Sequence, residues 1–390
     1  MNYNIWNKWD PLKTVLLGNC YGPDFFKDIK NSKIRSALTQ IAEETQEDLA
    51  YYEKVLKDFG CNVLRPQLDI SDSIMNYVNA SGAVAGHQGV PRAPLQPRDQ
   101  QLIAGNRCVS TGKDHPAIHQ TLLEYSNDTI LGDDLPLPEF KYNEIACMQS
   151  GDWPKWQDYF YNQQSRDNLK EHVKKEIKDL DFYPMPLSSA NSFVLGKKIM
   201  VGGKEFDYSK KLAGILFPEF NIEYTNIDGH IDANYHPLKP GVILSLYDVQ
   251  NYKKTFPGWD VCYFPDQSWD KVKGFLKLKN KVMGKWWVPE QEDNDDFTYF
   301  VETWLQDWVG YVEETVFDVN VLVLDEHHVC VNNMNPILID FLKKHKMEPI
   351  HIPWRHRYFW DGGLHCITLD LYREGKQQDY FPNRQTPVID

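Results

Sequence analysis

Four side chains that could carry a group-transfer reaction stand at three widely separated points of the chain: Asp99, His230 with Asp232, and Cys366. An ionised thiol is a strong nucleophile. An imidazole can pass a proton to a leaving group and take one from the next nucleophile. A pair of carboxylates can hold a cation that offers several N–H donors. Together these groups predict nucleophilic attack on a bound cationic substrate.

A guanidinium group fits this set of side chains. It is planar, positively charged and rich in donors, so carboxylates bind it in a bidentate manner. We expect Asp99 and Asp232 to hold its nitrogens. We expect His230 to shuttle the proton and Cys366 to attack the central carbon. Taken singly, each residue also has a structural explanation, because a free cysteine often behaves as a small, inert hydrophobe in a core.

Cys366 stands at the mouth of a predicted strand. Gly362 and Gly363 come shortly before it and permit a tight turn. Apolar and polar residues then alternate through 367–371, which is typical of a β-strand. The sequence therefore predicts a thiol presented on a turn that leads into a strand.

The rest of the chain repeats a hairpin–helix–strand unit. A strand at Lys13–Gly18, one long helix at Ser32–Phe59 and a strand at 61–66 open the chain. Hairpins are then predicted at 102–110, 193–203 and 321–331, with a further pair of strands after Asp232, the second at 241–246. Helices are predicted at 117–125, 166–180, 208–216 and 336–346. Asp99, His230 with Asp232, and Cys366 each precede the first strand of a unit. Equivalent positions in a radial arrangement converge on one axis, so these residues are expected to form one site.

Three stretches are predicted to be irregular. Residues 69–96 are rich in Ser, Gly, Ala and Pro and indicate a long surface loop that could border the site. The acidic run 290–296 indicates a solvated loop, and Asp325–His328 indicates a hairpin turn with exposed charges rather than a metal site.

Composition narrows the class of protein. The chain has 390 residues, 42% hydrophobic and 25% charged, with a net charge of −13. An acidic chain of this kind argues against a nucleic-acid partner, and it contains no apolar run of membrane-spanning length. Its seven cysteines form no C-x-x-C pair, and its N-terminus has no apolar signal core. We expect a cytoplasmic protein with neither a metal nor an organic cofactor and no membrane partner.

Several motifs resemble those of the amidinotransferases, close to the glycine amidinotransferase branch of the guanidino-group-modifying superfamily. The resemblance spans nearly the whole chain. The matching stretches are Pro97-Arg98-Asp99 with Gly105-Asn106, Gly151-Asp152-Trp153-Pro154, His230-Ile231-Asp232-Ala233 with 240–245, 320–326, and Gly362-Gly363-Leu364-His365-Cys366-Ile367-Thr368.

The resemblance implies an α/β fold, namely a five-module pseudo-symmetric α/β-propeller of repeated ββαβ units in a single closed domain over 1–390. It implies an enzyme that moves an amidino group from arginine, or a related guanidino donor, to a small amine acceptor through a covalent amidino-cysteine. By matching position, Cys366 is the nucleophile and His230 the general acid and base. Asp99 and Asp232 bind the guanidinium, and the further substrate-binding candidates are Asp152, Asn191 and Gly363.

The chain departs from the family pattern in places. The family has an acidic Asp-Ala-Ala-Asp motif where this chain has Ser189-Ala190-Asn191-Ser192, and Asp152 or Asp207 is the candidate replacement. A basic residue that helps to hold the donor's carboxylate is missing from 246–250, and Glu313-Glu314 stands where small hydroxyl residues are usual. A hydrolase of the same superfamily and a binding protein on a catalytically degenerate scaffold therefore remain alternatives. The oligomeric state is left open, with a homodimer as one candidate.

Overall fold

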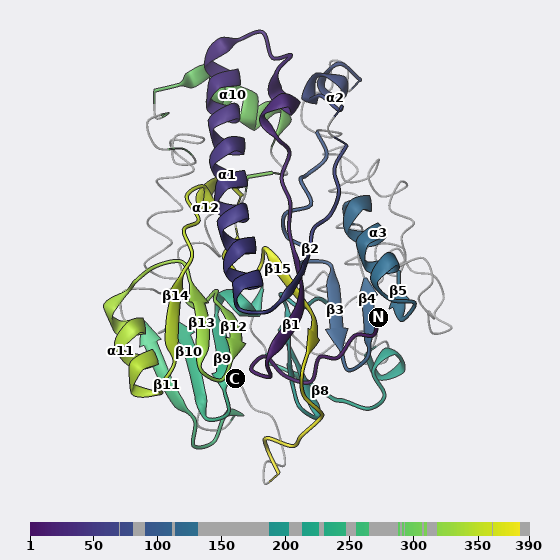
Figure 1. The fold of residues 1–390 in the computed structure, drawn as a ribbon, viewed down its shortest axis with the longest axis vertical. Coiled ribbons are helices and arrows are strands. Elements are labelled where there is room, and N and C mark those ends of the chain that lie inside the picture. The colour runs from purple at the N-terminus through teal and green to yellow at the C-terminus, as the bar shows by residue number, and fades with distance from the viewer. Residues whose placement is uncertain are drawn as a thin grey trace, which may run out of the picture.

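The computed structural model describes residues 1–69, 71–80, 90–110, 114–131, 187–202, 213–225, 230–246, 255–264, 288, 291, 293–305, 308–309, 318–360 and 362–382. Within these residues the chain forms an α/β fold (Figure 1). Its strands are β1 (Leu12–Leu17), β2 (Asn62–Leu64), β3 (Gln101–Ala104), β4 (Arg107–Ser110), β5 (Thr129–Ile130), β6 (Ser192–Leu195), β7 (Lys198–Val201), β8 (Asn221–Tyr224), β9 (Tyr235–Lys239), β10 (Val242–Leu246), β11 (Asp260–Phe264), β12 (Leu322–Asp325), β13 (His328–Val331), β14 (Glu348–His351) and β15 (Thr368–Arg373). Its helices are α1 (Ser32–Asp58), α2 (Ile74–Ala80), α3 (Pro116–Tyr125), α10 (Asp295–Trp304), α11 (Pro336–Lys344) and α12 (Arg357–Trp360), with 3₁₀ turns η1 (Pro23–Phe26) and η3 (Ile231–Ala233).

The described strands form five three-stranded sheets built to one plan. In each sheet the central strand pairs antiparallel with one neighbour and parallel with the other. The orders are β3-β4-β5, β6-β7-β8, β9-β10-β11, β12-β13-β14 and β15-β1-β2. The repeated hairpin–helix–strand unit predicted from the sequence therefore has a counterpart in the sheets, while the closed radial arrangement stays a prediction.

Glycine explains three of the hairpins. Gly105, Gly196 and Gly241 stand between the paired strands with φ of 58°, 67° and 84°. This left-handed conformation is open to glycine and strained for most other residues. In the fourth hairpin the Asp325 carboxylate accepts hydrogen bonds from the backbone N–H groups of His327 and His328. The predicted turn at Asp325–His328 is therefore confirmed.

The fifth sheet joins the two ends of the described chain. β1 pairs antiparallel with β15, and the register places Leu16 opposite Leu369 and Leu17 opposite Thr368. Figure 1 shows the yellow β15 lying along the purple β1. The strand that follows Cys366 is thus held by the first strand of the chain.

Helix α1 packs against the turn that carries Cys366, which is called the cysteine turn below. Asn31 caps its first turn by accepting a hydrogen bond from Lys33 N–H, and Gly60, with φ of 96°, follows its end. Its apolar face joins α10 and the turn residues Leu364 and Ile367 in one hydrophobic cluster. Figure 1 shows α1 as the long upright helix above the strands, with α10 beside its upper part.

Polar contacts tie the same helix to the segment just before the cysteine. Trp360 Nε1 donates to Thr45 Oγ1 at 2.9 Å, and Arg355 pairs with Asp48 at 2.9 Å. The His356 ring contacts the Glu44 carboxylate at 2.5 Å. These contacts fix α12 on α1 and thereby set where the following turn begins.

Several boundaries and two elements differ from the sequence predictions. Residues 69–96 were predicted to be loop, yet they contain α2. The acidic run was predicted to be a solvated loop, but its last two carboxylates open α10, because Asn294 accepts a hydrogen bond from Phe297 N–H and caps the helix. α11 ends at Lys344 rather than Lys346, and β15 begins at Thr368 rather than Ile367. The predicted helix at 166–180 lies outside the described residues.

Candidate functional site

Cys366 lies on the turn between α12 and β15 and is fully buried. The turn can form because Gly363 has no side chain. A Cβ at this position would lie 2.4 Å from Asn320 Oδ1, closer than any real contact. A Cβ at Gly362 would lie 2.9 Å from Gln96 Nε2 and 3.3 Å from Cys366 Cβ. The two glycines therefore allow the turn to press against Asn320 and Gln96.

Among the described residues, Asn320 and Asp232 contact the Cys366 sulfur from other parts of the chain. Asn320 Nδ2 donates a hydrogen bond to Sγ at 3.0 Å. The thiol in turn donates to Asp232 Oδ2 at 3.7 Å. Cys366 and Asp232 were predicted to share a site, and the structure brings them together.

Asp232 lies on η3 and is completely buried. Its carboxylate accepts a hydrogen bond from His365 Nδ1 at 2.6 Å. Burial holds the pKa of His365 well below its ordinary value, and the nearby cation of Arg98 adds to this effect. A neutral His365 that donates from Nδ1 therefore orients a carboxylate that lies next to the sulfur.

His230 directly precedes η3 and stands two residues before Asp232. Its side chain is half buried, and its backbone carbonyl accepts a hydrogen bond from Asn234 Nδ2 at 3.0 Å. The short 3₁₀ turn therefore places His230 two residues before Asp232 and shortly before β9 begins at Tyr235.

Asp99 is also half buried, and its segment is fastened to the cysteine turn. Gln96 Nε2 donates to Trp360 O at 2.7 Å, just before the turn. Arg98 Nε lies 2.6 Å from His365 O and 2.7 Å from Thr368 O, on either side of Cys366. The predicted carboxylate at position 99 thus stands on a segment that side-chain hydrogen bonds join to the backbone on both sides of Cys366.

Asn191 occupies the place where the family pattern has an acid. Its amide N–H donates to Ser188 O at 3.2 Å, and its side-chain Nδ2 lies 3.4 Å from Gly202 O. The preceding residue, Ala190, accepts a hydrogen bond from Asp232 N–H at 3.2 Å. The uncharged side chain therefore lies next to the site, while Asp152 and Asp207, the candidate replacements, lie outside the described residues.

A buried ion cluster lies under the turn. Asp370 on β15 pairs with Arg98 at 2.8 Å, with Arg373 at 2.9 Å and with Lys8 at 3.7 Å. All four side chains are at most 3% exposed. Arg98 links this cluster to the backbone around Cys366, so the charges and the turn form one structural unit.

Sequence reasoning missed several of these residues. Asn320 and His365 stand within motifs that match the family, yet neither was given a role. Arg98 is the middle residue of the Pro97-Arg98-Asp99 motif, and its place in this motif was a signal that could have indicated a role. No sequence pattern indicated a role for His236. Its buried ring packs edge-on against His365, with ring centres 4.7 Å apart.

The buried Lys8 predicts a pH dependence of stability. Burial lowers its pKa to about 7 from 10.5, although Asp370 opposes the shift. Between these two pH values the unfolded chain binds a proton that the folded chain releases. The contribution of Lys8 to the free energy of unfolding is therefore expected to increase from pH 7 to pH 10.5. Urea unfolding across this range should show this increase for the exposed Lys13→Met variant, as for wild type. The increase should be absent from Lys8→Met. Equal pH slopes in wild type and Lys8→Met would contradict this prediction.

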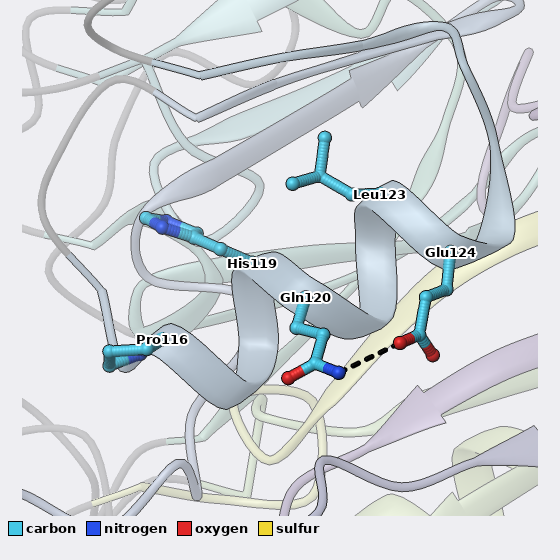
Figure 2. A pocket seen from close by; sticks show the side chains of 5 residues that line it. All are labelled: Pro116, His119, Gln120, Leu123 and Glu124. Atoms are coloured by element: carbon cyan, nitrogen blue, oxygen red, sulfur yellow. Dashed lines mark hydrogen bonds between the residues drawn. The ribbon is translucent and has the colours of Figure 1, made fainter.

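One surface depression lies apart from these residues. It is lined by Pro116, His119, Gln120, Leu123 and Glu124, which all belong to α3. Figure 2 shows them along one side of the helix, with Gln120 Nε2 bonded to Glu124 Oε1 at 2.8 Å. None of the predicted site residues lines this depression, so it is not the candidate site.

Known proteins resemble this chain in sequence. No protein-family model matches the chain. It is 22% identical over 408 residues to the mitochondrial glycine amidinotransferase of Xenopus laevis, which covers 96% of this chain and 84% of that protein. It is 27% identical over 153 residues to the L-arginine:L-lysine amidinotransferase of Pseudomonas savastanoi pv. phaseolicola, over 39% of this chain and 33% of that protein.

Two solved structures share the fold. An amidinotransferase of Microseira wollei from the saxitoxin biosynthetic pathway has a TM-score of 0.59 at 19% identity, covering 97% of this chain and 99% of that one. The inosamine-phosphate amidinotransferase of Streptomyces griseus has a TM-score of 0.58 at 17% identity, with the same coverage.

The two solved structures show the fold of this chain, and the curated sequence relatives are enzymes named for amidino transfer. More particularly, this chain is a homologue of the amidinotransferases, so the resemblance predicted from the motifs is confirmed. No described helix combines the length and the apolar character that crossing a bilayer requires.

Proposed function

We propose that this protein moves an amidino group from a guanidino donor to an amine acceptor and that Cys366 carries the group between them. The observation that supports this most strongly is the position of the Cys366 sulfur. It lies 3.7 Å from the buried Asp232 carboxylate, on a turn that is tied to Asp99 through its neighbours. Since one curated relative is named for arginine as a reactant, arginine is the first donor to test.

Binding of the donor would use the carboxylates. Asp232 and Asp99 would each accept N–H groups of the guanidinium, which is suited to paired, charge-assisted hydrogen bonds. Because Asp232 Oδ2 lies so close to Sγ, a guanidinium held there would bring its central carbon toward the sulfur. Proximity of this kind is worth several powers of ten in rate.

The reaction would then proceed in two balanced steps. In the first, Sγ of ionised Cys366 forms a bond to the central carbon, the C–N bond to the donor's amine breaks, and that amine takes a proton from His230. In the second, the acceptor amine gives a proton to His230 and attacks the amidino carbon. The S–C bond breaks and the thiolate returns. No oxidant, reductant or metal is consumed.

The finer architecture is part of the same proposal. We infer that the five sheets stand around one axis as a closed five-module α/β-propeller in a single domain over 1–390. The common plan of the sheets and the pairing of β1 with β15 support this inference. We propose that it acts in the cytoplasm and without a cofactor, with a homodimer as one candidate assembly.

One observation favours a second candidate. Asn191 carries no charge at the position where the family has an acid, and its Oδ1 is buried without a hydrogen-bond partner among the described residues. A protein that binds a guanidino compound but does not turn it over is therefore the competing function.

Intact-protein mass spectrometry after brief incubation with arginine tests the proposal. Wild type is expected to gain the mass of one amidino group, and Cys366→Ala is expected to gain none. Cys262→Ala, a matched change at a buried cysteine on β11, should still form the adduct. Addition of candidate amines should then clear the adduct and give a new guanidino product.

Other outcomes separate the alternatives. An adduct that decays to ammonia and a ureido product without an amine would favour the hydrolase. Arginine binding by calorimetry without an adduct would favour the binding protein. An adduct of the same size on Cys366→Ala would rule out this cysteine as the carrier.

A further inference from the structure

Asn320 lies just before β12 and is almost completely buried. It stands 46 residues before Cys366 in the sequence, yet its side chain contacts the sulfur directly. None of the comparisons gives a role to this residue, and the sequence analysis assigned none.

Both ends of the Asn320 amide are in use. Its Oδ1 accepts hydrogen bonds from the backbone N–H of His365 at 2.9 Å and from that of Cys366 at 3.4 Å. Its Nδ2 donates to Cys366 Sγ at 3.0 Å. Because two N–H donors face one end of the amide, that end must be the oxygen, and the NH₂ end must face the sulfur.

The turn is shaped around this amide. A Cβ at Gly363 would lie 2.4 Å from Asn320 Oδ1 and 2.7 Å from its Cγ. Glycine at 363 is therefore required by the close approach of the Asn320 side chain. The Oδ1 bonds also occupy the two backbone N–H groups that could otherwise turn toward the sulfur.

Ionisation of Cys366 is favoured by a hydrogen-bond donor such as Asn320 Nδ2. On its other side the sulfur faces the Asp232 carboxylate at 3.7 Å, and a negative sulfur would be repelled by it. His365 partly offsets the carboxylate charge through its 2.6 Å hydrogen bond. A neutral N–H donor aimed at the sulfur favours the anion and is strengthened when the charge forms.

We propose that Asn320 is a catalytic residue, whose Nδ2–H stabilises the anionic sulfur of Cys366 while its Oδ1 fixes the turn that presents this sulfur. The proposal rests on the proposed function in one respect, namely that the ionised Cys366 is the attacking group. The donor acts both on the free enzyme and after the amidino group leaves, when the thiolate is regenerated.

Titration of the thiolate tests this role without any substrate. The ultraviolet absorbance of the thiolate is followed against pH in full-length wild type, with Cys366→Ala subtracted to isolate this one cysteine. Asn320→Asp keeps an oxygen for the two backbone N–H groups and replaces the donor by an acceptor. Its titration midpoint is expected to move upward by about one pH unit or more.

A second variant separates charge from loss of the donor. Asn320→Leu has a similar size, carries no charge and cannot donate, so its midpoint should also rise, by less than that of Asn320→Asp. Asn221→Asp, at an exposed position on β8, is the matched control and should leave the midpoint unchanged. The rate of adduct formation at neutral pH should fall about tenfold or more for Asn320→Asp and by a smaller factor for Asn320→Leu.

The outcomes are distinct from those that test the proposed function. If both folded Asn320 variants titrate like wild type, the assigned role is wrong, whatever the protein does with arginine. If Asn320→Asp fails to fold, Asn320→Leu decides alone. If the midpoints rise as expected but wild type forms no adduct with arginine, the role of Asn320 stands and the proposed donor is wrong.

Discussion

Replacing Asp232 with asparagine is expected to reduce amidino transfer about a thousandfold, which corresponds to about 4 kcal/mol of transition-state stabilisation. The carboxylate accepts the 2.6 Å hydrogen bond from His365 and lies 3.7 Å from the Cys366 sulfur. Asparagine has nearly the same shape but cannot pair with a cation, so the guanidinium loses its charged partner. Steady-state kinetics with arginine should show a fall in kcat/KM.

The thiol should respond in the opposite sense, which makes the test specific. Without the neighbouring carboxylate, a negative sulfur at Cys366 is no longer repelled, so its titration midpoint should fall while turnover is lost. Asp293→Asn, at an exposed position, is the matched control. An Asp232→Asn variant that retains full kcat/KM would show that the guanidinium is held elsewhere.

Replacing Asp370 with asparagine is expected to lower the free energy of unfolding by about 3–5 kcal/mol, because the buried cations Arg98 and Arg373 lose the anion that they share within the ion cluster, as does Lys8 when protonated. Burial alone would raise the pKa of Asp370. The cations Arg373, Arg98 and Lys8 outweigh burial and hold that pKa well below 3.8. The carboxylate therefore stays ionised in the folded protein at all ordinary pH values.

The sign of the pH dependence follows from this shift. A carboxylate whose folded pKa is depressed contributes stability that is fully present above its unfolded value, near 3.8, and is lost as the pH falls through the folded pKa. Urea unfolding at neutral pH should therefore show the full difference between wild type and Asp370→Asn. Asp340→Asn, exposed on α11, should unfold like wild type. Equal stability of Asp370→Asn and this control would mean that the cluster contributes nothing.

Local sequence signals predicted the repeated unit well, because each depends on a few neighbouring residues. The glycines at 105 and 196 mark turns that the structure contains at those points, whereas Gly241, placed at the start of a predicted strand, lies in the turn before β10. The long helix was predicted to within one residue of α1, because apolar residues recur at helical spacing and Gly60 ends it. α2 was missed because it is only seven residues long, contains two Asn and lies in a stretch rich in Ser, Gly, Ala and Pro, which is typical of loops.

The interior of the site could be predicted only in part. Motif order brought Cys366 and Asp232 into one hypothesis, and the structure places them in contact. Other residues that contact the Cys366 sulfur or the ion cluster around Asp370 lie far away in the sequence. Asn320 reaches the sulfur across 46 residues, and Lys8 meets Asp370 from the opposite end of the chain. A single sequence contains no signal for such pairings, since each residue has an unremarkable local environment.

Pairing of the first strand with the last has a consequence for biosynthesis. β1 leaves the ribosome early but cannot complete its sheet until β15 has been translated. Cys366 lies two residues before β15, so the segment that carries this thiol is synthesised late and can take its buried place only after most of the chain has been made. Nascent chains must therefore keep β1 unpaired on one edge while the intervening residues fold, which favours binding of a chaperone at that edge. The covalent step that we propose for Cys366 therefore requires a chain whose synthesis is nearly finished.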